Sequence, residues 1–378
     1  MMQQAVVDHF TALTGVPPAG VWAAPGRINL IGEHTDYNGG FVLPFAIPQA
    51  AYLAASPRPD HRWRFVSLDL AEAVEAGLDD LRPGEAGWHA YLAGVVWALR
   101  EAGHEVGGAD LVLSSDVPIG AGLSSSAAIE CVTITALCDL YGIELNAMER
   151  AQLAQIAENA YVGAPTGLMD QAASTLCTAD HALFMDCRSL VTEQVPLEVT
   201  EAGLEILVID TKSRHSHVDG EYAARRAACT EACRLLGIES LRDVTDLDAA
   251  LAALPQLEAR RVRHVVTENR RVLAAVEALG AGDFTRLGEL MTSSHISMRD
   301  DYEITAETVD LAVDVVLAHG ALGARMTGGG FGGCVLALVA AVDVAVISTD
   351  VSLAFAQAGF DAPVTFLGRP SAGARRLA

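Results

Sequence analysis

Charged and hydrogen-bonding side chains crowd into residues 26–40, GRINLIGEHTDYNGG, where glycines allow the backbone a tight path. The stretch contains Arg27, Glu33, His34, Asp36, Tyr37 and Asn38. Carboxylates and an imidazole that converge on a small volume suit the hydroxyl groups of a sugar, because each acceptor can bind an O–H group. Such a site rejects an analogue that lacks a hydroxyl by about 10⁴-fold or more, since its buried polar groups would stay unpaired. We therefore interpret these residues as a sugar-binding loop.

Two other interpretations of this loop stay open. Glu33, His34 and Asp36 could ligate a metal ion, although a structural site generally takes about four protein ligands. The residues could also form a solvated turn, in which Asp, Asn and Gly are common. Neither interpretation accounts for Arg27 in the adjacent strand-like run.

A second stretch, PIGAGLSSSA at residues 118–127, places two glycines and three serines at the start of an apolar helix pattern. Backbone N–H groups that are free at a helix N-terminus attract an anion, so this stretch predicts a phosphate-binding loop. No lysine follows as in a Walker loop, and Lys212 is the only lysine of the chain. Because the helix dipole contributes only about 0.3–1 kcal/mol, a triphosphate would also need Mg²⁺, to which a serine hydroxyl can be a ligand. The alternative is an ordinary serine-capped helix.

A glycine-rich turn, MTGGGFGGC at residues 326–334, strengthens the phosphate interpretation. It has five glycines between two strand-like runs, more than a two-residue hairpin turn needs. Glycines cost conformational entropy on folding, so a ligand that approaches the backbone explains them better than a flexible hairpin, which is the alternative. We expect both glycine segments to face one site.

Apolar patterns indicate the elements that position these loops. In the first half, strand-like runs occur at GVWAAPGRINLIG (20–32), AAYLAAS (50–56), RWRFVSL (62–68), ADLVLSS (109–115) and ALFMDC (182–187). Residues 123–140 are apolar on nearly every face, which predicts a buried helix. In the second half, the strand LEILVID (204–210) precedes a long helical region, about 218–319, with breaks at Gly237, Pro255 and Gly280.

The remaining order of elements predicts the fold of the second half. It consists of the strand GARMT (323–327), the glycine-rich turn, the strand CVLALVA (334–340), a helix near 351–359 and the strand PVTFLG (363–368). Together with the preceding strand and helices this is a split βαβ order, typical of a ferredoxin-like domain. At 378 residues the chain exceeds the size of one core. We expect an α/β (α+β) protein with a mixed-sheet domain over 1–200, a ferredoxin-like domain over 201–378, and the active site in the cleft between them.

Composition excludes several classes of protein. The chain is 51% apolar and 19% charged, which argues against disorder. With 48 acidic and 25 basic residues its formal charge is −23, so we expect neither nucleic acid nor an anionic membrane as a partner. Seven cysteines without CxxC pairs indicate reduced thiols, and no run approaches the about 18 apolar residues of a membrane span. We expect a soluble cytoplasmic protein, a monomer or weak homodimer.

The three loop sequences together resemble motifs of the GHMP kinases, and among these the galactokinases. GRINLIGEHTDYNGG is similar to the galactokinase sugar signature, PIGAGLSSSA to the nucleotide loop of the family, and MTGGGFGGC to its third motif. Further similar stretches are TGLMDQAAS, GEYAARRAAC, RVRHVVTENRRV and SHISMRDDYEIT. The resemblance covers nearly the whole chain and implies the two-domain GHMP kinase fold.

The resemblance also implies roles for single residues. Asp170 would be the catalytic base with Arg27 as its charged partner, and Ser126 and Glu158 would bind Mg²⁺. The implied sugar-binding residues are Glu33, His34, Thr35, Asp36, Gly167, Asp170 and Tyr222. The implied ATP-binding residues are Ser67, Trp88, Gly120, Ala121, Gly122, Leu123, Ser124, Ser125 and Ser126.

Some of these residues have ordinary structural interpretations. Trp88 and Tyr222 could be half-buried helix anchors, and Asp170 could be a helix cap. The chain departs from the family pattern at Thr166 and at Asp210-Thr211-Lys212, which bears on fine sugar preference rather than on the reaction.

The implied reaction is transfer of the γ-phosphoryl group of ATP to the anomeric hydroxyl of α-D-galactose, the entry step of galactose catabolism. Positioning and charge neutralisation carry most of the catalysis in such transfers. Rival hypotheses are a GHMP kinase for mevalonate, homoserine or N-acetylgalactosamine, and a galactose sensor without catalysis. GEHTDYNGG argues against the first two acceptors, and the intact serine helix and Asp170 argue against a sensor.

Overall fold

The computed structural model describes residues 2–214 and 218–378. The strands are β1 (Gly20–Asn29), β2 (Phe41–Val42), β3 (Pro44–Arg58), β4 (Trp63–Ser67), β5 (Glu72–Ala76), β6 (Gly108–Ser115), β7 (His181–Asp186), β8 (Thr192–Pro196), β9 (Leu204–Arg214), β10 (Gly323–Thr327), β11 (Gly332–Ala340), β12 (Val364–Leu367) and β13 (Arg375–Arg376). The helices are α1 (Met2–Thr14), α2 (Ala90–Glu101), α3 (Ser125–Tyr141), α4 (Ala147–Ile156), α5 (Met169–Leu176), α6 (Val218–Leu236), α7 (Leu247–Ala253), α8 (Gln256–Gly280), α9 (Phe284–Ser297), α10 (Glu307–Ala318) and α11 (Val344–Ala358).

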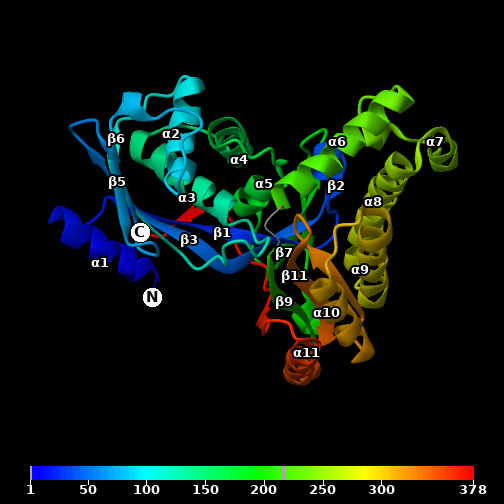
Figure 1. The fold of residues 1–378 in the computed structure, drawn as a ribbon. Helices are drawn as coiled ribbons and strands as arrows, with labels where there is room; N and C mark the ends of the chain where they lie inside the picture. Colours follow the sequence, from blue (N-terminus) through cyan, green and yellow to red (C-terminus); the bar gives the residue numbers. More distant parts are fainter. Residues whose placement is uncertain (1, 215–217) are drawn as a thin grey trace.

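A six-stranded mixed sheet, in the order β13-β1-β3-β6-β4-β5, forms the frame of the first half. Helix α1 covers one face, where Val6 and Phe10 pack on Val21 and Val112. Helices α2 to α5 cover the other face (Figure 1). Every residue of β1 is buried, because the strand lies between these two layers.

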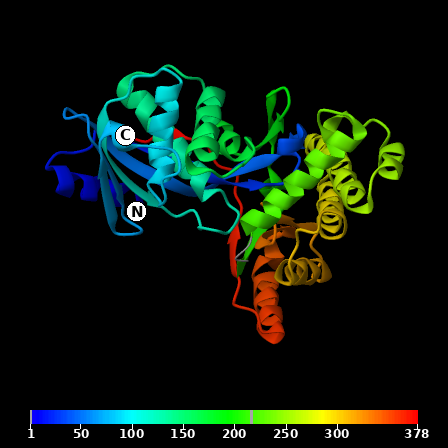
Figure 2. The same cartoon turned by 45° about the horizontal axis from the view of Figure 1, so that its top comes forward.

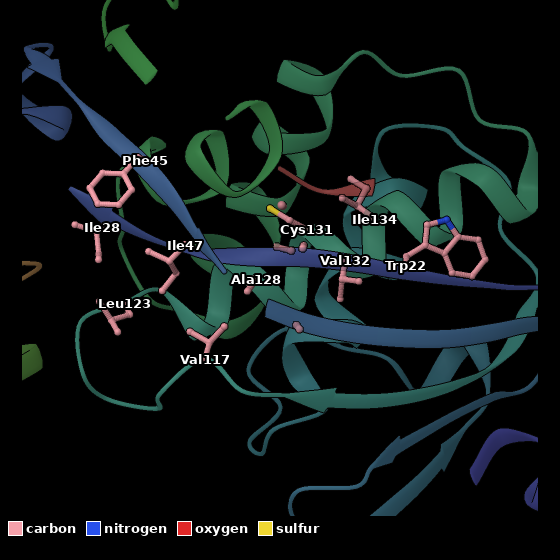
Figure 3. Packing of buried hydrophobic residues seen from close by; sticks show 14 of the residues in the cluster. Trp22, Ile28, Phe45, Ile47, Val117, Leu123, Ala128, Cys131, Val132 and Ile134 are labelled. Atoms are coloured by element: carbon pink, nitrogen blue, oxygen red, sulfur yellow. The ribbon is translucent and has the colours of Figure 1, made fainter. Parts of the chain in front are cut away.

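Helix α3 is the central helix of the first half and lies against β1 and β3. Its buried residues, among them Ala128, Cys131, Val132 and Ile134, fall on several faces, which confirms the predicted buried helix. Figure 3 shows them beside Trp22 of β1 within one hydrophobic core. This packing fixes the N-terminus of α3 next to the end of β1.

The second half has the predicted ferredoxin-like arrangement. Its four-stranded antiparallel sheet has the order β10-β11-β9-β12, so the first strand in sequence, β9, is central. The breaks expected in the long helical region occur where they were predicted: α6 ends before Gly237, Pro255 precedes α8, and α8 ends at Gly280. Figure 2 shows α6, in bright green, beginning near the first half at the centre of the molecule and running outward from it.

Several elements were not expected from the sequence. They include α1, α4, β5, the final strand β13, and a three-stranded sheet β2-β7-β8 of which only β7 was predicted. β13 pairs with β1 through Trp22 and Arg376, so the last residues of the second half return to the first sheet. The division of the chain near residue 200 stays a prediction.

Within the described residues, one segment, Ala341–Ala358, is long and apolar enough to cross a membrane, with a mean hydropathy of 1.3. It contains Asp343 and Asp350, and 17% of the segment is buried. Ile347, Val351 and Phe355 of this segment are buried in the hydrophobic core of the second half. All seven cysteines are free thiols.

Candidate active site

The two glycine-rich segments pack directly against each other, and both line one cavity of about 280 Å³. A Cβ atom built on Gly328 would lie 3.0 Å from the carbonyl oxygen of Gly122, and one on Gly333 would lie 3.2 Å from that of Ala121. Gly122 and Gly328 have φ values of 76° and 94°, which other residues rarely adopt. The cavity is lined by Arg27, Glu33, His34, Asp36, Gly120, Gly122, Leu123, Ser124, Ser125, Ser126, Thr166, Gly167, Met169, Asp170, Tyr222, Gly328 and Gly329.

Asp170, in the first turn of α5, joins the end of β1 to the start of α3. Its Oδ1 lies 2.8 Å from Nε and 2.7 Å from Nη2 of Arg27. Its Oδ2 accepts a hydrogen bond of 2.5 Å from the hydroxyl of Ser124. Arg27 also donates to the carbonyl of Gly122, at 2.5 Å. The arginine therefore holds the aspartate next to residues 118–127, which we call the nucleotide-type loop.

Ser124 precedes α3 in a left-handed conformation, with φ 57° and ψ 53°. A non-glycine residue in this region is uncommon and costs free energy, which is typical of functional sites. Its side chain makes no cap hydrogen bond to the helix backbone and donates to Asp170 instead. The alternative of an ordinary serine-capped helix is therefore wrong for Ser124, and the N-terminus of α3 faces the cavity with Ser125 and Ser126.

The carboxylate of Glu33 is buried and surrounded by four donors. Oε1 accepts from the hydroxyl of Thr327 at 3.0 Å and from the backbone N–H of Gly328 at 2.8 Å. Oε2 accepts from the side chain of Asn29 and lies 3.0 Å from Nη2 of Arg325. Burial raises the pKa of Glu33, an effect that the nearby arginine opposes. Four donors match the four lone-pair sites of a carboxylate, so the orientation of Glu33 is fixed from all sides.

His34 is buried among aromatic rings and is neutral, because burial lowers its pKa to about 3. Its Nε2 lies 3.2 Å from the carbonyl of Gly329, which can only accept, so we assign the proton to Nε2. Nδ1 then accepts from the hydroxyl of Tyr37 at 2.7 Å. Tyr37 is in turn 2.9 Å from the hydroxyl of Tyr302. The ring of Tyr222 lies 5.2 Å from that of His34 and covers this side of the cavity.

Asp36 lies directly against Gly167. A Cβ atom on Gly167 would lie 1.7 Å from Oδ2 of Asp36, so only glycine fits at this position. Burial raises the pKa of Asp36 to about 6, and the charge of Asp170 adds to the shift. Three acidic residues, Glu33, Asp36 and Asp170, line the cavity, and Arg27 is the one arginine among the described residues that line it.

Glu158 lies in a π-helical segment, Ala157–Val162, of the kind that is frequent at functional sites. Its carboxylate accepts from Thr166 at 2.9 Å and from Gln171 at 2.6 Å. Burial raises its pKa, and the nearby side chain of Ser126 and these hydrogen bonds act to lower it. Adjacent serine and carboxylate oxygens fit Mg²⁺, which prefers few protein oxygens together with phosphate oxygens.

The alternative of a metal site in residues 26–40, which we call the sugar-type loop, finds no support. Within residues 2–214 and 218–378, no group of three or more His, Cys, Asp and Glu side chains is arranged to hold a metal ion. Glu33 and His34 already have protein partners, as described above.

Some predicted site residues are not among those that line the cavity. The side chain of Thr35 is buried, and its hydroxyl lies 2.8 and 2.6 Å from the carbonyls of Gly32 and Phe41, where it shapes the loop. Ala121 and Glu158 are also buried.

The predicted adenine-end residues, Ser67 and Trp88, also lie outside the lining of the cavity. Trp88 donates to Glu72 at 2.9 Å, and Glu72 pairs with Ser67 across β4 and β5, so the two residues lie in one region. Their contact with ATP stays a prediction.

Sequence reasoning missed residues that the second half supplies to the site. Gly328 and Gly329 line the cavity, and Thr327 and Arg325 hold Glu33. The glycine-rich turn was predicted to belong to the site, but Arg325 was not. An arginine inside the apolar strand GARMT was the available signal, because a buried charge needs a partner.

Comparison with known proteins agrees with this geometry. The galactokinase galactose-binding signature matches residues 8–57, the N-terminal domain of GHMP kinases residues 90–178, and their C-terminal domain residues 275–350. The galactokinase of Streptomyces coelicolor is 54% identical over 98% of this chain and 98% of its own, and that of Streptomyces lividans 50% identical over 96% and 92%. The crystal structure of Lactococcus lactis galactokinase complexed with galactose has a TM-score of 0.95 at 32% identity, over 100% of both chains. The fold, the facing glycine loops and the extent of these similarities agree, and the chain belongs to the galactokinase family of GHMP kinases.

Proposed function

We propose that the chain transfers the γ-phosphoryl group of ATP to the anomeric hydroxyl of α-D-galactose and releases galactose 1-phosphate and ADP. One observation carries this proposal. Asp170 lies at the junction of the sugar-type loop and the nucleotide-type loop, held by Arg27 on one oxygen and by Ser124 on the other. A base at this junction can reach a sugar hydroxyl that faces a phosphate at the start of α3.

Asp170 is the proposed base. As the hydroxyl oxygen forms a bond to phosphorus, its O–H bond breaks and the proton passes to a carboxylate oxygen of Asp170. Both near donors of Arg27 contact Oδ1. Oδ2 is therefore the oxygen that can exchange the Ser124 hydroxyl for the hydroxyl of the sugar. Arg27 keeps the carboxylate in place and supplies positive charge beside the transferring group.

The start of α3 is the proposed phosphate site. Its free backbone N–H groups and dipole favour an anion, and Ser124 leaves them uncapped. Ser126 and Glu158 would hold Mg²⁺, because their side-chain oxygens lie near each other and Mg²⁺ prefers oxygen ligands. When bound, Mg²⁺ would neutralise the charge of the phosphates. Ser67 and Trp88 remain proposed contacts of the adenine end of ATP.

The opposite side of the cavity is the proposed galactose site. Asp36 and Asp170 supply acceptors, and the ring of Tyr222 supplies an apolar surface against the sugar. Gly167 leaves room for Asp36. Glu33, His34 and Thr35 remain proposed sugar-binding residues, although their side chains already have protein partners.

An ADP-release assay tests the proposal. The purified chain is offered galactose, glucose, N-acetylgalactosamine, mevalonate and homoserine, each with and without Mg²⁺. We expect rapid ADP release with galactose and Mg²⁺ and little with the other acceptors. Faster turnover of N-acetylgalactosamine would make the protein a kinase for another sugar. Galactose binding without ADP release under any condition would indicate a sensor.

A further inference from the structure

Arg325 is a buried arginine that no step of the proposed reaction uses. It lies in the middle of β10, two residues before Thr327, and is 0% exposed. A buried guanidinium is costly unless its charge and its N–H groups have partners, so its partners indicate its purpose.

The partners of Arg325 belong mostly to the sugar-type loop of the other half. Nη1 donates to the carbonyls of Asn29 and Leu30, at 3.1 and 3.0 Å. Nη2 lies 3.0 Å from Oε2 of Glu33. These carbonyls belong to the end of β1 and the residue after it, and Glu33 follows three residues later. One side chain thus holds both the start of the loop and its buried carboxylate.

Arg325 is the main positive charge that compensates the carboxylate of Glu33. A second carboxylate, Glu268, is also buried and lies 3.8 Å from Nη2. Glu268 binds the backbone N–H of Gly32 at 3.0 Å and pairs with its own arginine, Arg271, at 2.6 Å. Without Arg325, Glu33 and Glu268 would repel each other with no charge between them.

We propose that Arg325 is a positioning residue for the acceptor sugar: it acts through Glu33 to fix the shape of the loop that binds galactose. The inference rests on the proposed function, because it assumes that the loop binds the sugar. According to this inference, Arg325 of β10, a strand of the second half, contributes to galactose affinity. Among the described residues, its guanidinium does not contact the nucleotide-type loop.

The test compares galactose binding by R325M and R325K with that of the wild type, using titration calorimetry with galactose alone. We expect R325M to raise the galactose Kd by about tenfold or more, the range for a lost charged hydrogen bond. R325K should recover part of the affinity, because a lysine keeps the charge but cannot span Glu33 and both carbonyls. The KM for ATP should stay close to the wild-type value.

Arg261 offers a matched control. It is 2% exposed, and like Arg325 it has an Nε atom without a hydrogen-bond partner among the described residues. It binds the carbonyl of Asp301 and the carboxylate of Glu303 and lies 5.7 Å from the centre of the ring of Tyr302, and among the described residues it makes no contact with Glu33. R261M should lower the melting temperature but leave the galactose Kd near the wild-type value. Equal weakening of galactose binding by R261M and R325M would overturn the proposal.

A double-mutant cycle separates action through Glu33 from a general effect on folding. In an E33Q background, R325M should raise the galactose Kd less than it does in the wild type, since the glutamine needs no counter-charge and only the contacts with the two carbonyls are lost. If R325M weakens binding as much in that background as alone, the proposal fails. Should E33Q or R325M not fold or not bind, the comparison of R325K with R261M decides. Failure of the wild type to bind galactose would refute the proposed function instead.

Discussion

Arg27 contacts Asp170 through two nitrogens that meet the same oxygen, Nε at 2.8 Å and Nη2 at 2.7 Å from Oδ1. The geometry leaves Oδ2 without a charged partner, and the hydroxyl of Ser124 occupies it. The two carboxylate oxygens are therefore unequal: one anchors the side chain, and the other can receive a proton.

Replacing Asp170 by asparagine should remove the proton acceptor and keep the shape of the site. We expect D170N to lower kcat by about 10²–10⁴-fold, the range for a lost general base. Galactose binding should be largely retained, because an amide still offers an acceptor oxygen. ADP release and calorimetry with galactose measure the two effects, and a variant with more than a tenth of the wild-type rate would refute the role of Asp170.

Replacing Arg27 by methionine should release Asp170 and the carbonyl of Gly122 together. We expect R27M to lower kcat by about 10²–10³-fold, comparable with the loss of one transition-state donor. R27K should remain well below the wild type, since one ammonium cannot hold both partners. A kcat for R27K equal to that of the wild type would show that charge alone is sufficient.

The raised pKa of Asp36, about 6, predicts a pH dependence of galactose binding. Sugar hydroxyls donate to the ionised carboxylate, so binding should favour this form and release protons near pH 6. The galactose Kd should therefore rise as the pH falls through about 6. Calorimetry in buffers of different ionisation enthalpy detects the released protons, and D36N should bind weakly without this dependence.

The same shift affects stability with a definite sign. The pKa of Asp36 in the folded chain lies above its ordinary value of 3.8, so between these values the folded state holds more protons than the unfolded state. The free energy of unfolding contributed by this group therefore decreases as the pH rises from about 4 to about 6. Relative to D36N, the wild type should lose stability over this range in denaturant titrations. A difference that does not vary with pH would contradict the shift.

Adding a methyl group at Gly167 should displace Asp36, because the new Cβ would lie 1.7 Å from Oδ2. We expect G167A to weaken galactose binding by about 10²-fold or more, as a buried acceptor is moved away from its hydroxyl. Gly220 in α6 is the control, since a Cβ there meets nothing within 4 Å. G220A should bind galactose as the wild type does, and equal behaviour of the two variants would show that Asp36 is not needed.

Ser126 and Glu158 provide the test of the metal site. S126A and E158Q should each raise the Mg²⁺ concentration for half-maximal rate, and E158Q more strongly because it removes the charged ligand. Binding of Mn²⁺ with ATP, followed by electron paramagnetic resonance, gives a readout that does not depend on turnover. Unchanged metal affinity in both variants would place the metal elsewhere.

The sequence predicted the elements that have clear periodic patterns. β10 occurs at the residues expected, 323–327, and α3 begins two residues later than predicted. The short strands β2 and β13 have two residues each, too few to show a period, and their pairing depends on contacts with distant strands. Helix α1 was not predicted, because it buries only Val6 and Phe10 and so has a weak apolar pattern.

The candidate site was predictable to the extent that its chemistry lies in motifs. Glycine and serine patterns indicated which loops meet, and Gly122 and Gly328 do face each other. The hydroxyl of Ser124 donates to Asp170 and does not cap α3. This depends on the left-handed backbone of Ser124, which no sequence pattern predicted. The role of Arg325 depends on a contact between strands of different sheets, which only the folded chain defines.

The pairing of β13 with β1 has a consequence for folding during translation. A ribosome delivers β1 early, but the strand that covers its outer edge leaves the exit tunnel only with residues 375–376. Until then the nascent chain displays an open edge, to which strands of neighbouring chains can add. High-level expression should therefore depend on chaperones that shield this edge during translation.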